Sequence, residues 1–316
     1  MTSDDASLVL IAAVLLAAIA VSEFERRLRG LRPDGAHGRL ARWRHPAGGL
    51  VGWVCEVLAN SRALRAFCSL LPVAAFRSDI TDVVYVNYVV PSERLTPLLP
   101  EGLELQRLGD GSSSLFTFLT YRHGHFGPSM LGPLRSIFGS PVQTNWRIYV
   151  RDPRTGHTGV YFVTTGIGSW VNALGARLMA EGLPMHLLAN GEVTRDDSGA
   201  MHVVVDPGHG SGPDADVTLT PVADVELPAE FRAVFASWHE LLAYDVPQDR
   251  ALSTQPWART TTREEIDLGI PLSSCEPMLG VVRSRAARAI VGDATPVCFR
   301  VATVPFRFVG EVIDRW

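Results

Sequence analysis

The chain has 316 residues, of which 47% are hydrophobic and 20% are charged, and its formal net charge is −4. This apolar content is enough to bury a large core, which excludes a disordered or fibrous protein, and the acidic balance argues against nucleic-acid binding. All 29 side chains counted as Lys or Arg are arginine. A guanidinium has a pKa of about 12 or more, so it stays protonated and cannot attack a carbonyl as an amine does. Schiff-base catalysis by a lysine side chain is therefore excluded.

An uncharged apolar run from Ala6 to Ser22 stands near the start of the sequence. As a helix it would be about 26 Å long, close to the roughly 30 Å of a bilayer core. Seven arginines against three acids follow in residues 23–45, and they place the rest of the chain in the cytoplasm by the positive-inside rule. We therefore expect residues 1–22 to form an outer tail and a single-pass span in the cell membrane, with a helix buried at a domain edge as the alternative.

Residues 23–49 are rich in Arg and Gly and are predicted to be a juxtamembrane linker. Residues 50–78 are predicted to be a helical segment, because apolar side chains recur at helical spacing from Leu50 to Leu71. This helix would cover the main domain or lie on the membrane surface. The four cysteines form no C-x-x-C pair and there is no H-E-x-x-H motif, so we expect neither a metal nor another cofactor.

Residues 79–316 are predicted to form one α+β domain. Two helices are expected, at Ser169–Glu181 and Ala229–Ala243. Many strands separated by turns, with few helices, favour a mostly antiparallel barrel or curved sheet over a doubly wound sheet. The predicted strands are residues 82–90, 103–108, 113–122, 143–152, 158–166, 201–207, 216–222 and 297–312.

The predicted hairpin over residues 143–166 has one polar and one apolar face. Asn145, Arg147 and Tyr149 share a face of its first strand, and apolar side chains alternate with them. The polar face either meets water or lines a barrel interior. Inside a barrel, Arg147 would need an anionic partner, because a buried unpaired charge is costly. That partner could be a carboxylate of the protein, such as Glu276, or one on a ligand.

Two runs of the sequence carry a family resemblance, VVYVNYVVPSERLTPLLPEGLELQRLGDGSSSLFTFLTY and TNWRIYVRDPRTGHTGVYFVTTGIGSWVNALGARLMAEGLPMH. Over roughly residues 80–310 the chain resembles the YqjF-like uncharacterised family within the acetoacetate decarboxylase-like superfamily. The most specific element is the hairpin from Asn145 to Phe162. The resemblance implies a cone-shaped, mostly antiparallel β-barrel with a few covering helices and a small-molecule pocket inside.

The resemblance also implies roles for particular residues. Arg147 and Tyr149 match polar pocket positions, and Tyr161 matches an aromatic on the facing strand. The decarboxylases of the superfamily form an iminium with a lysine, and this activity cannot be carried over to a chain without lysine. Gln143 stands where we associate relatives with an acidic residue, which puts an acid or base role there in doubt.

Three further residues are candidates for the site. His123 and His125 lie at a strand end and are expected to point the same way, where they could move protons or contact a ligand; a polar loop is the alternative. Two histidines are too few for a zinc site. Glu276, the only acid between Asp267 and Asp293, could be buried beside an arginine or lie on an exposed turn.

Together these features predict a barrel that binds a small anionic or carbonyl compound. If it is an enzyme, we expect lyase or hydratase chemistry without a Schiff base. The alternative is a non-catalytic membrane-associated scaffold or interaction protein with a degenerate pocket. The expected partners are the ligand and the membrane, through the N-terminal helix, and self-association into a homo-oligomer stays open. The expected catalytic residues are Glu276, His123 and Tyr149, and the expected ligand-binding residues are Asn145, Arg147, Tyr161 and His125.

Overall fold

The computed structural model describes residues 13, 16–21, 24, 41–68, 75–137, 139–180, 182–255 and 259–316. Most of the predicted membrane span and linker lies outside these ranges. Within them, no helix has both the length and the apolar character needed to cross a bilayer. The described part of the chain therefore gives the predicted span no support.

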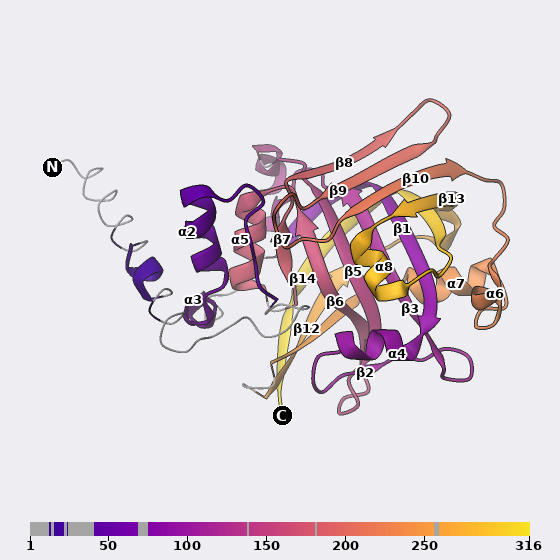
Figure 1. The fold of residues 1–316 in the computed structure, drawn as a ribbon, viewed down its shortest axis with the longest axis horizontal. Coiled ribbons are helices and arrows are strands. Elements are labelled where there is room, and N and C mark those ends of the chain that lie inside the picture. The colour runs from indigo at the N-terminus through magenta and orange to yellow at the C-terminus, as the bar shows by residue number, and fades with distance from the viewer. Residues whose placement is uncertain are drawn as a thin grey trace.

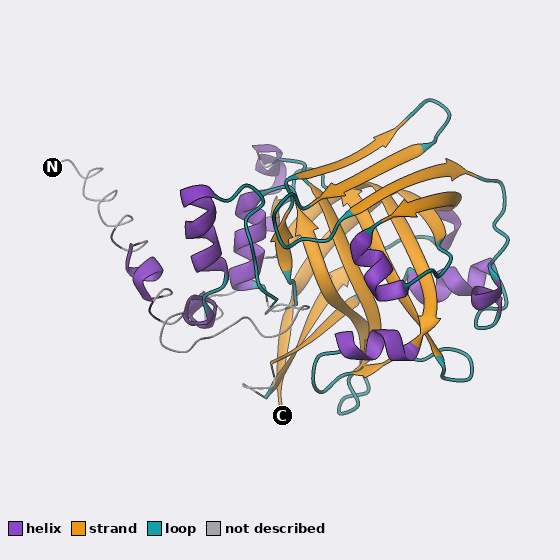
Figure 2. Ribbon diagram, in the orientation of Figure 1, coloured by secondary structure: helices purple, strands orange, loops and turns teal. Residues whose placement is uncertain are grey.

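A large sheet dominates the fold (Figure 2). The pairing of its strands includes a closed ring of seven. Each strand bonds to the next, and the last bonds back to the first. Neighbours in the ring are antiparallel except β6 and β11, which are parallel. In ring order the strands are β1 (Phe76–Pro91), β3 (Ser113–Arg122), β5 (Val142–Arg151), β6 (Thr158–Ile167), β11 (Arg250–Gln255), β12 (Thr260–Asp267) and β14 (Val297–Arg315).

The sheet continues beyond the ring from β14. The extension folds over the outside of β3 and β5, so the apolar outer face of β5 is buried beneath it. Its strands are β13 (Cys275–Arg283), β10 (Ala215–Pro221), β9 (Met201–Asp206) and β8 (Asn190–Arg195). Three short strands pair with strands of the ring: β2 (Glu104–Leu105) with β5, β4 (Gly127–Pro128) with β1, and β7 (Met185–Leu187) with β6.

Helices gather at the two ends of the sheet (Figure 1). At one end lie α2 (Gly49–Ala59), α3 (Arg62–Cys68) and α5 (Trp170–Met179), and at the other α6 (Ala229–Arg232) and α7 (Trp238–Asp245). Other helical segments in the described part of the chain are α4 (Ser92–Leu95), α8 (Arg285–Val291), η1 (Thr96–Leu98), η2 (Ser129–Ile137) and η4 (Leu272–Ser274).

Each of two predicted helices is interrupted. The helix predicted from Leu50 ends at Ala59, because the Asn60 side chain donates hydrogen bonds to the backbone oxygens of Glu56 and Trp43. The helix predicted over residues 229–243 divides into α6 and α7. A second helix begins there because the Ser237 hydroxyl accepts the Glu240 amide as an N-cap. The α+β class and the mostly antiparallel sheet are as predicted.

Candidate functional site

A cavity of about 50 Å³ lies inside the ring. Six of the seven ring strands line it, and only β11 contributes no side chain. Most of the lining is apolar, and the polar lining residues are Tyr85, Tyr121, Asn145, Arg147 and Gln248.

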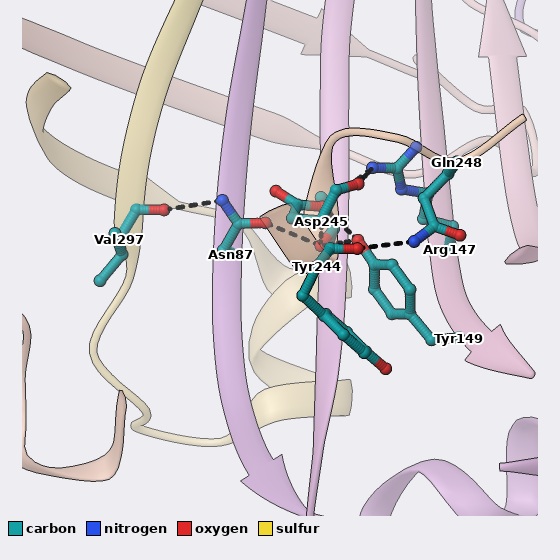
Figure 3. Close-up of polar contacts among 8 residues, drawn as sticks. Asn87, Arg147, Tyr149, Tyr244, Asp245, Gln248 and Val297 are labelled. Carbon is teal, nitrogen blue, oxygen red and sulfur yellow. Dashed lines mark hydrogen bonds and ion pairs between the residues drawn. The ribbon is translucent and has the colours of Figure 1, made fainter. Parts of the chain in front are cut away.

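Arg147 carries the positive charge in the cavity wall, and only 4% of the residue is exposed. Its Nη2 donates to Asp245 Oδ1 at 2.9 Å and to the Asp245 backbone oxygen at 3.0 Å (Figure 3). The guanidinium also lies 5.5 Å from the ring centroid of Tyr85 and 5.6 Å from that of Tyr149. Burial alone would lower the pKa of Arg147, but the Asp245 carboxylate raises it above its ordinary value. The cavity wall therefore holds a permanent cation.

Asp245 ends α7 and is completely buried, and a chain of polar groups leads away from it (Figure 3). The Tyr149 hydroxyl donates to Asp245 Oδ1 and lies 2.9 Å from Thr117 Oγ1. Thr117 donates to Asn87 Oδ1 at 2.7 Å, and Asn87 Nδ2 donates to the Val297 backbone oxygen at 3.2 Å. Burial raises the pKa of Tyr149 well above its ordinary value, so this hydroxyl keeps its proton. The contacts tie α7 to four ring strands.

Among the described residues, two atoms of this buried pair find no hydrogen-bond partner, Arg147 Nε and Asp245 Oδ2. An unsatisfied buried polar atom costs about 1–3 kcal/mol, so such atoms are uncommon in folded proteins. Arg147 lines the cavity, but its Nε is itself buried, so a bound molecule could reach this donor only after neighbouring side chains move.

A second polar chain reaches the cavity at Tyr121. Asn145 Nδ2 donates to the Tyr121 hydroxyl at 3.1 Å, and Gln143 Nε2 donates to Asn145 Oδ1 at 2.8 Å. Gln143 Oε1 lies 2.9 Å from His123 Nε2, and His123 Nδ1 lies 2.9 Å from Ser78 Oγ. Because an amide oxygen only accepts, this arrangement assigns the proton to His123 Nε2. The Tyr121 oxygen accepts from Asn145, so its own hydrogen is available to the cavity.

The environment keeps this second chain neutral. Burial lowers the pKa of His123 to about 4, although the hydrogen bond to Gln143 opposes the shift. Burial likewise raises the pKa of Tyr121 above its ordinary value. At neutral pH the chain therefore offers hydrogen bonds and no charge.

The structure brings together part of the predicted site. Asn145, Arg147 and Tyr149 face the ring interior, as expected for a polar strand face inside a closed sheet. His123 is buried next to them through Gln143 but does not line the cavity. His125 is exposed and its φ of 52° turns the backbone away, so the prediction that the two histidines point the same way is wrong.

Tyr161 lies on the other face of the sheet from the cavity. It stands opposite Ile148 across the hairpin, and opposed residues share a face. Both belong to the apolar cluster between the ring and its extension, together with Trp146. The expectation that Tyr161 shares a pocket with Arg147 is therefore wrong.

Glu276 does not pair with Arg147. Its Oε2 lies 2.7 Å from Arg300 Nη1, and the side chain is 52% exposed. The counter-ion of Arg147 is Asp245, which the sequence analysis missed. A signal was present, because Asp245 follows Leu241 and Leu242 at helical spacing and so falls on the apolar face of its helix.

Acidic, histidine and cysteine side chains do not gather into a metal site in the described part of the chain. No group of three or more of them there could hold a metal ion. The four cysteines are free, and burial raises the pKa of Cys298 to about 12.

Solved structures identify the class of fold. An acetoacetate decarboxylase from Legionella pneumophila subsp. pneumophila str. Philadelphia 1 has a TM-score of 0.52 at 12% identity, covering 77% of this chain and 88% of its own. An acetoacetate decarboxylase-like enzyme from Sphingomonas wittichii RW1 has a TM-score of 0.52 at 10% identity, covering 78% and 95%. The enduracididine biosynthesis enzyme MppR complexed with pyruvate has a TM-score of 0.51 at 13% identity, covering 77% and 91%. The chain has the acetoacetate decarboxylase-like fold.

A match to a family model is more specific than the similarity of fold. A model of the DUF2071 family, described as an uncharacterized conserved protein (COG2071), matches residues 77–239. This match spans just over half of the 316 residues, and the chain belongs to that family. The comparison with curated proteins finds no match.

Proposed function

We propose that the ring is the cone-shaped barrel of this fold and that its cavity binds a small molecule bearing a carboxylate or a carbonyl. The observation that carries the proposal is Arg147, a buried cation that lines the cavity. An oxygen atom of the ligand would pair with its guanidinium. The complex of MppR with pyruvate supports the proposal, because there a small oxo acid binds a protein of the same fold.

The chemistry available in the cavity wall is donation of hydrogen bonds. Burial raises the pKa of Tyr85 and of Tyr121 above the ordinary value, so both hydroxyls stay protonated. Together with Arg147 they would stabilise negative charge on a substrate oxygen. This arrangement suits proton transfer beside a carbonyl, of the lyase or hydratase kind. It needs no imine, which a chain without lysine cannot form through a side chain.

A non-catalytic scaffold is the second candidate, and two observations favour it. Asp245 already neutralises Arg147, and the cavity has a volume of only about 50 Å³. A ligand too large for this volume would have to displace side chains that line the cavity, such as Gln248, on entering.

Calorimetry and thermal unfolding with pyruvate, acetoacetate, acetate and acetone separate the two candidates. The binding proposal expects at least one of these compounds to bind wild type saturably and raise its Tm, and Arg147→Gln to abolish the effect. Arg300→Gln is the matched control, because Arg300 is similarly buried in an ion pair but lies outside the cavity lining. If no compound affects wild type, the scaffold is favoured. If Arg147→Gln binds as wild type does, Arg147 is not the anchor.

A further inference from the structure

The cavity has one side deep in the ring and another at the molecular surface. Its polar side chains from β1, β3 and β5 are all buried: Tyr85, Tyr121, Asn145 and Arg147. Five other lining residues are only half-buried and are called the rim below: Gln248, Ile266, Leu268, Ile270 and Phe306. The rim is therefore the part of the lining where a bound molecule would meet solvent.

The rim is a continuous stretch of surface. The Ile266 amide donates to the backbone oxygen of Asp249, the neighbour of Gln248, at 2.9 Å. Ile266 pairs with Phe308 of β14, two positions from the rim residue of that strand. The other two rim residues follow β12 directly along the chain. Apart from Gln248, every side chain of the rim is apolar.

The rim lies across the ring from β3 and β5, which carry three of the four buried polar side chains. In ring order β1 separates these strands from β14 on one side, and β6 and β11 separate them from β12 on the other. The rest of the lining is apolar: Ile80, Val83, Leu119, Val160, Phe162 and Val304. The cavity therefore has a polar end inside the ring and an apolar exit at the rim.

The polar end suits a single polar head group. The Arg147 guanidinium and the Tyr121 hydroxyl supply donors there, and the Tyr121 oxygen accepts from Asn145 at 3.1 Å. Of the lining residues away from this end, only Gln248 is polar, and its Nε2 already donates to the Tyr244 backbone oxygen at 2.7 Å. A second charged group on the ligand would lie among apolar side chains, which is unfavourable.

We infer that the ligand is a monocarboxylate with an alkyl chain of several carbons, such as a 2-oxo acid longer than pyruvate. This inference rests on the function proposed above and specifies the class of ligand. The carboxylate or carbonyl lies at the polar end, and the chain runs along the apolar lining to the rim. Each methylene group that leaves water for an apolar contact strengthens binding by up to about fourfold.

Calorimetry with the full-length protein and straight-chain 2-oxo acids tests this chain dependence. The series is pyruvate, 2-oxobutanoate, 2-oxopentanoate and 2-oxohexanoate. We expect the Kd to fall about two- to fourfold with each added methylene group. The dicarboxylate 2-oxoglutarate matches 2-oxopentanoate in chain length but carries a second carboxylate. It should bind about tenfold more weakly, because that group would meet apolar side chains.

A matched pair of variants locates the alkyl chain. Leu268→Ala removes apolar surface from the rim, so it should weaken binding of 2-oxohexanoate at least about threefold more than binding of pyruvate. Leu272→Ala is the same change in a half-buried leucine of the same segment that does not line the cavity, and it should leave the series unchanged. Thermal unfolding without ligand shows that both variants are folded.

Binding of pyruvate with no gain along the series would overturn the inference and leave the proposed function intact. Absence of binding for every acid would overturn the proposed function, and the inference with it. Equal affinity for 2-oxoglutarate and 2-oxopentanoate would contradict the apolar exit. A Leu272→Ala variant that loses as much affinity for 2-oxohexanoate as Leu268→Ala would overturn the placement of the chain at the rim.

Discussion

The buried ion pair of Arg147 and Asp245 contributes to the free energy of unfolding. Removal of one partner from a buried ion pair leaves an uncompensated charge, which costs about 3–5 kcal/mol. We therefore expect Asp245→Asn to lower the free energy of unfolding by about 3 kcal/mol or more, measured by urea denaturation. The Tyr149 hydroxyl, which donates to the same carboxylate, loses a charged acceptor in this variant as well.

Two further variants show whether the loss comes from the pair. Asp216→Asn removes an exposed carboxylate beside His202 and should change stability by less than about 1 kcal/mol. The double variant Arg147→Met/Asp245→Leu removes both charges and should be more stable than Asp245→Asn alone, because no buried charge remains unpaired. A double variant that is less stable than the single one would contradict this account.

The buried His123 predicts a loss of stability in mild acid. Its pKa is about 4 in the folded protein, and an unfolded histidine titrates near 6.5. The unfolded chain therefore binds the extra proton between these pH values, so stability is complete above pH 6.5 and falls as the pH drops towards 4. By pH 5 the loss is about 2 kcal/mol, to be measured as the difference in unfolding free energy between pH 7 and pH 5.

The variant His123→Gln keeps hydrogen-bonding capacity without a titrating ring, and it should remove this part of the pH dependence. His239→Gln changes an exposed histidine and serves as the control. His186 is also buried with a lowered pKa, so some pH dependence persists in every variant. A profile for His123→Gln that parallels wild type would show that His123 does not titrate as described.

The sequence predicted that β5 has one polar and one apolar face, but not which parts of the protein each face contacts. Alternation alone separated Arg147 from Ile148, because successive strand residues point to opposite sides. The pocket role of Tyr161 was taken from the family resemblance, which did not fix the face of β6 on which this residue lies. The loop pairs Arg151 with Thr158, which puts Tyr161 opposite Ile148 on the outer face. The register depends on the loop, and strand alternation does not reveal it.

Contacts between distant elements could not be predicted from the sequence. Arg147 and Asp245 are 98 residues apart, and only the closure of the ring around the end of α7 brings them together. The strands β11, β12 and β13 were missed because polar and apolar residues alternate weakly in them, as in TTTREEID of β12. The local sequence pattern predicted the fold class. It could not predict the counter-ion of Arg147, because only the tertiary structure brings that carboxylate next to the arginine.

Ring closure at the parallel pair of β6 and β11 depends on a glycine. A Cβ on Gly159 would lie 2.6 Å from the backbone oxygen of Arg250, which is too close for any side chain. We expect Gly159→Ala to lower the free energy of unfolding by about 1–3 kcal/mol, as overpacking against a fixed backbone does. The measurement is chemical denaturation followed by circular dichroism.

The matched substitution Gly175→Ala lies within α5, where a Cβ meets nothing within 4 Å. Alanine is a better helix former than glycine, so this variant should gain about 0.5–1 kcal/mol. The same chemical change thus has opposite expected signs in the two elements. Equal effects at both positions would argue against the close approach of β6 and β11.

The segment that matches the family model does not contain the strands that close the ring. The match ends at residue 239, within α7, while β11, β12 and β14 lie beyond it. Without them β1 would lose its partner β14, β6 would lose β11, and Arg147 would lose Asp245. Such a fragment would expose unpaired strand edges and bury an uncompensated charge.

We therefore predict that a fragment of residues 75–239 forms no cooperative fold, whereas residues 41–316 retain one. The physical reason is that the ring is a single closed hydrogen-bonded unit, and its last strand pairs with its first across more than 200 residues of chain. Thermal unfolding by calorimetry and amide dispersion in NMR spectra measure the outcome. A sharp transition in the 75–239 fragment would show that half of the ring is stable without closure. A missing transition in the 41–316 fragment would instead show that stability depends on residues before 41.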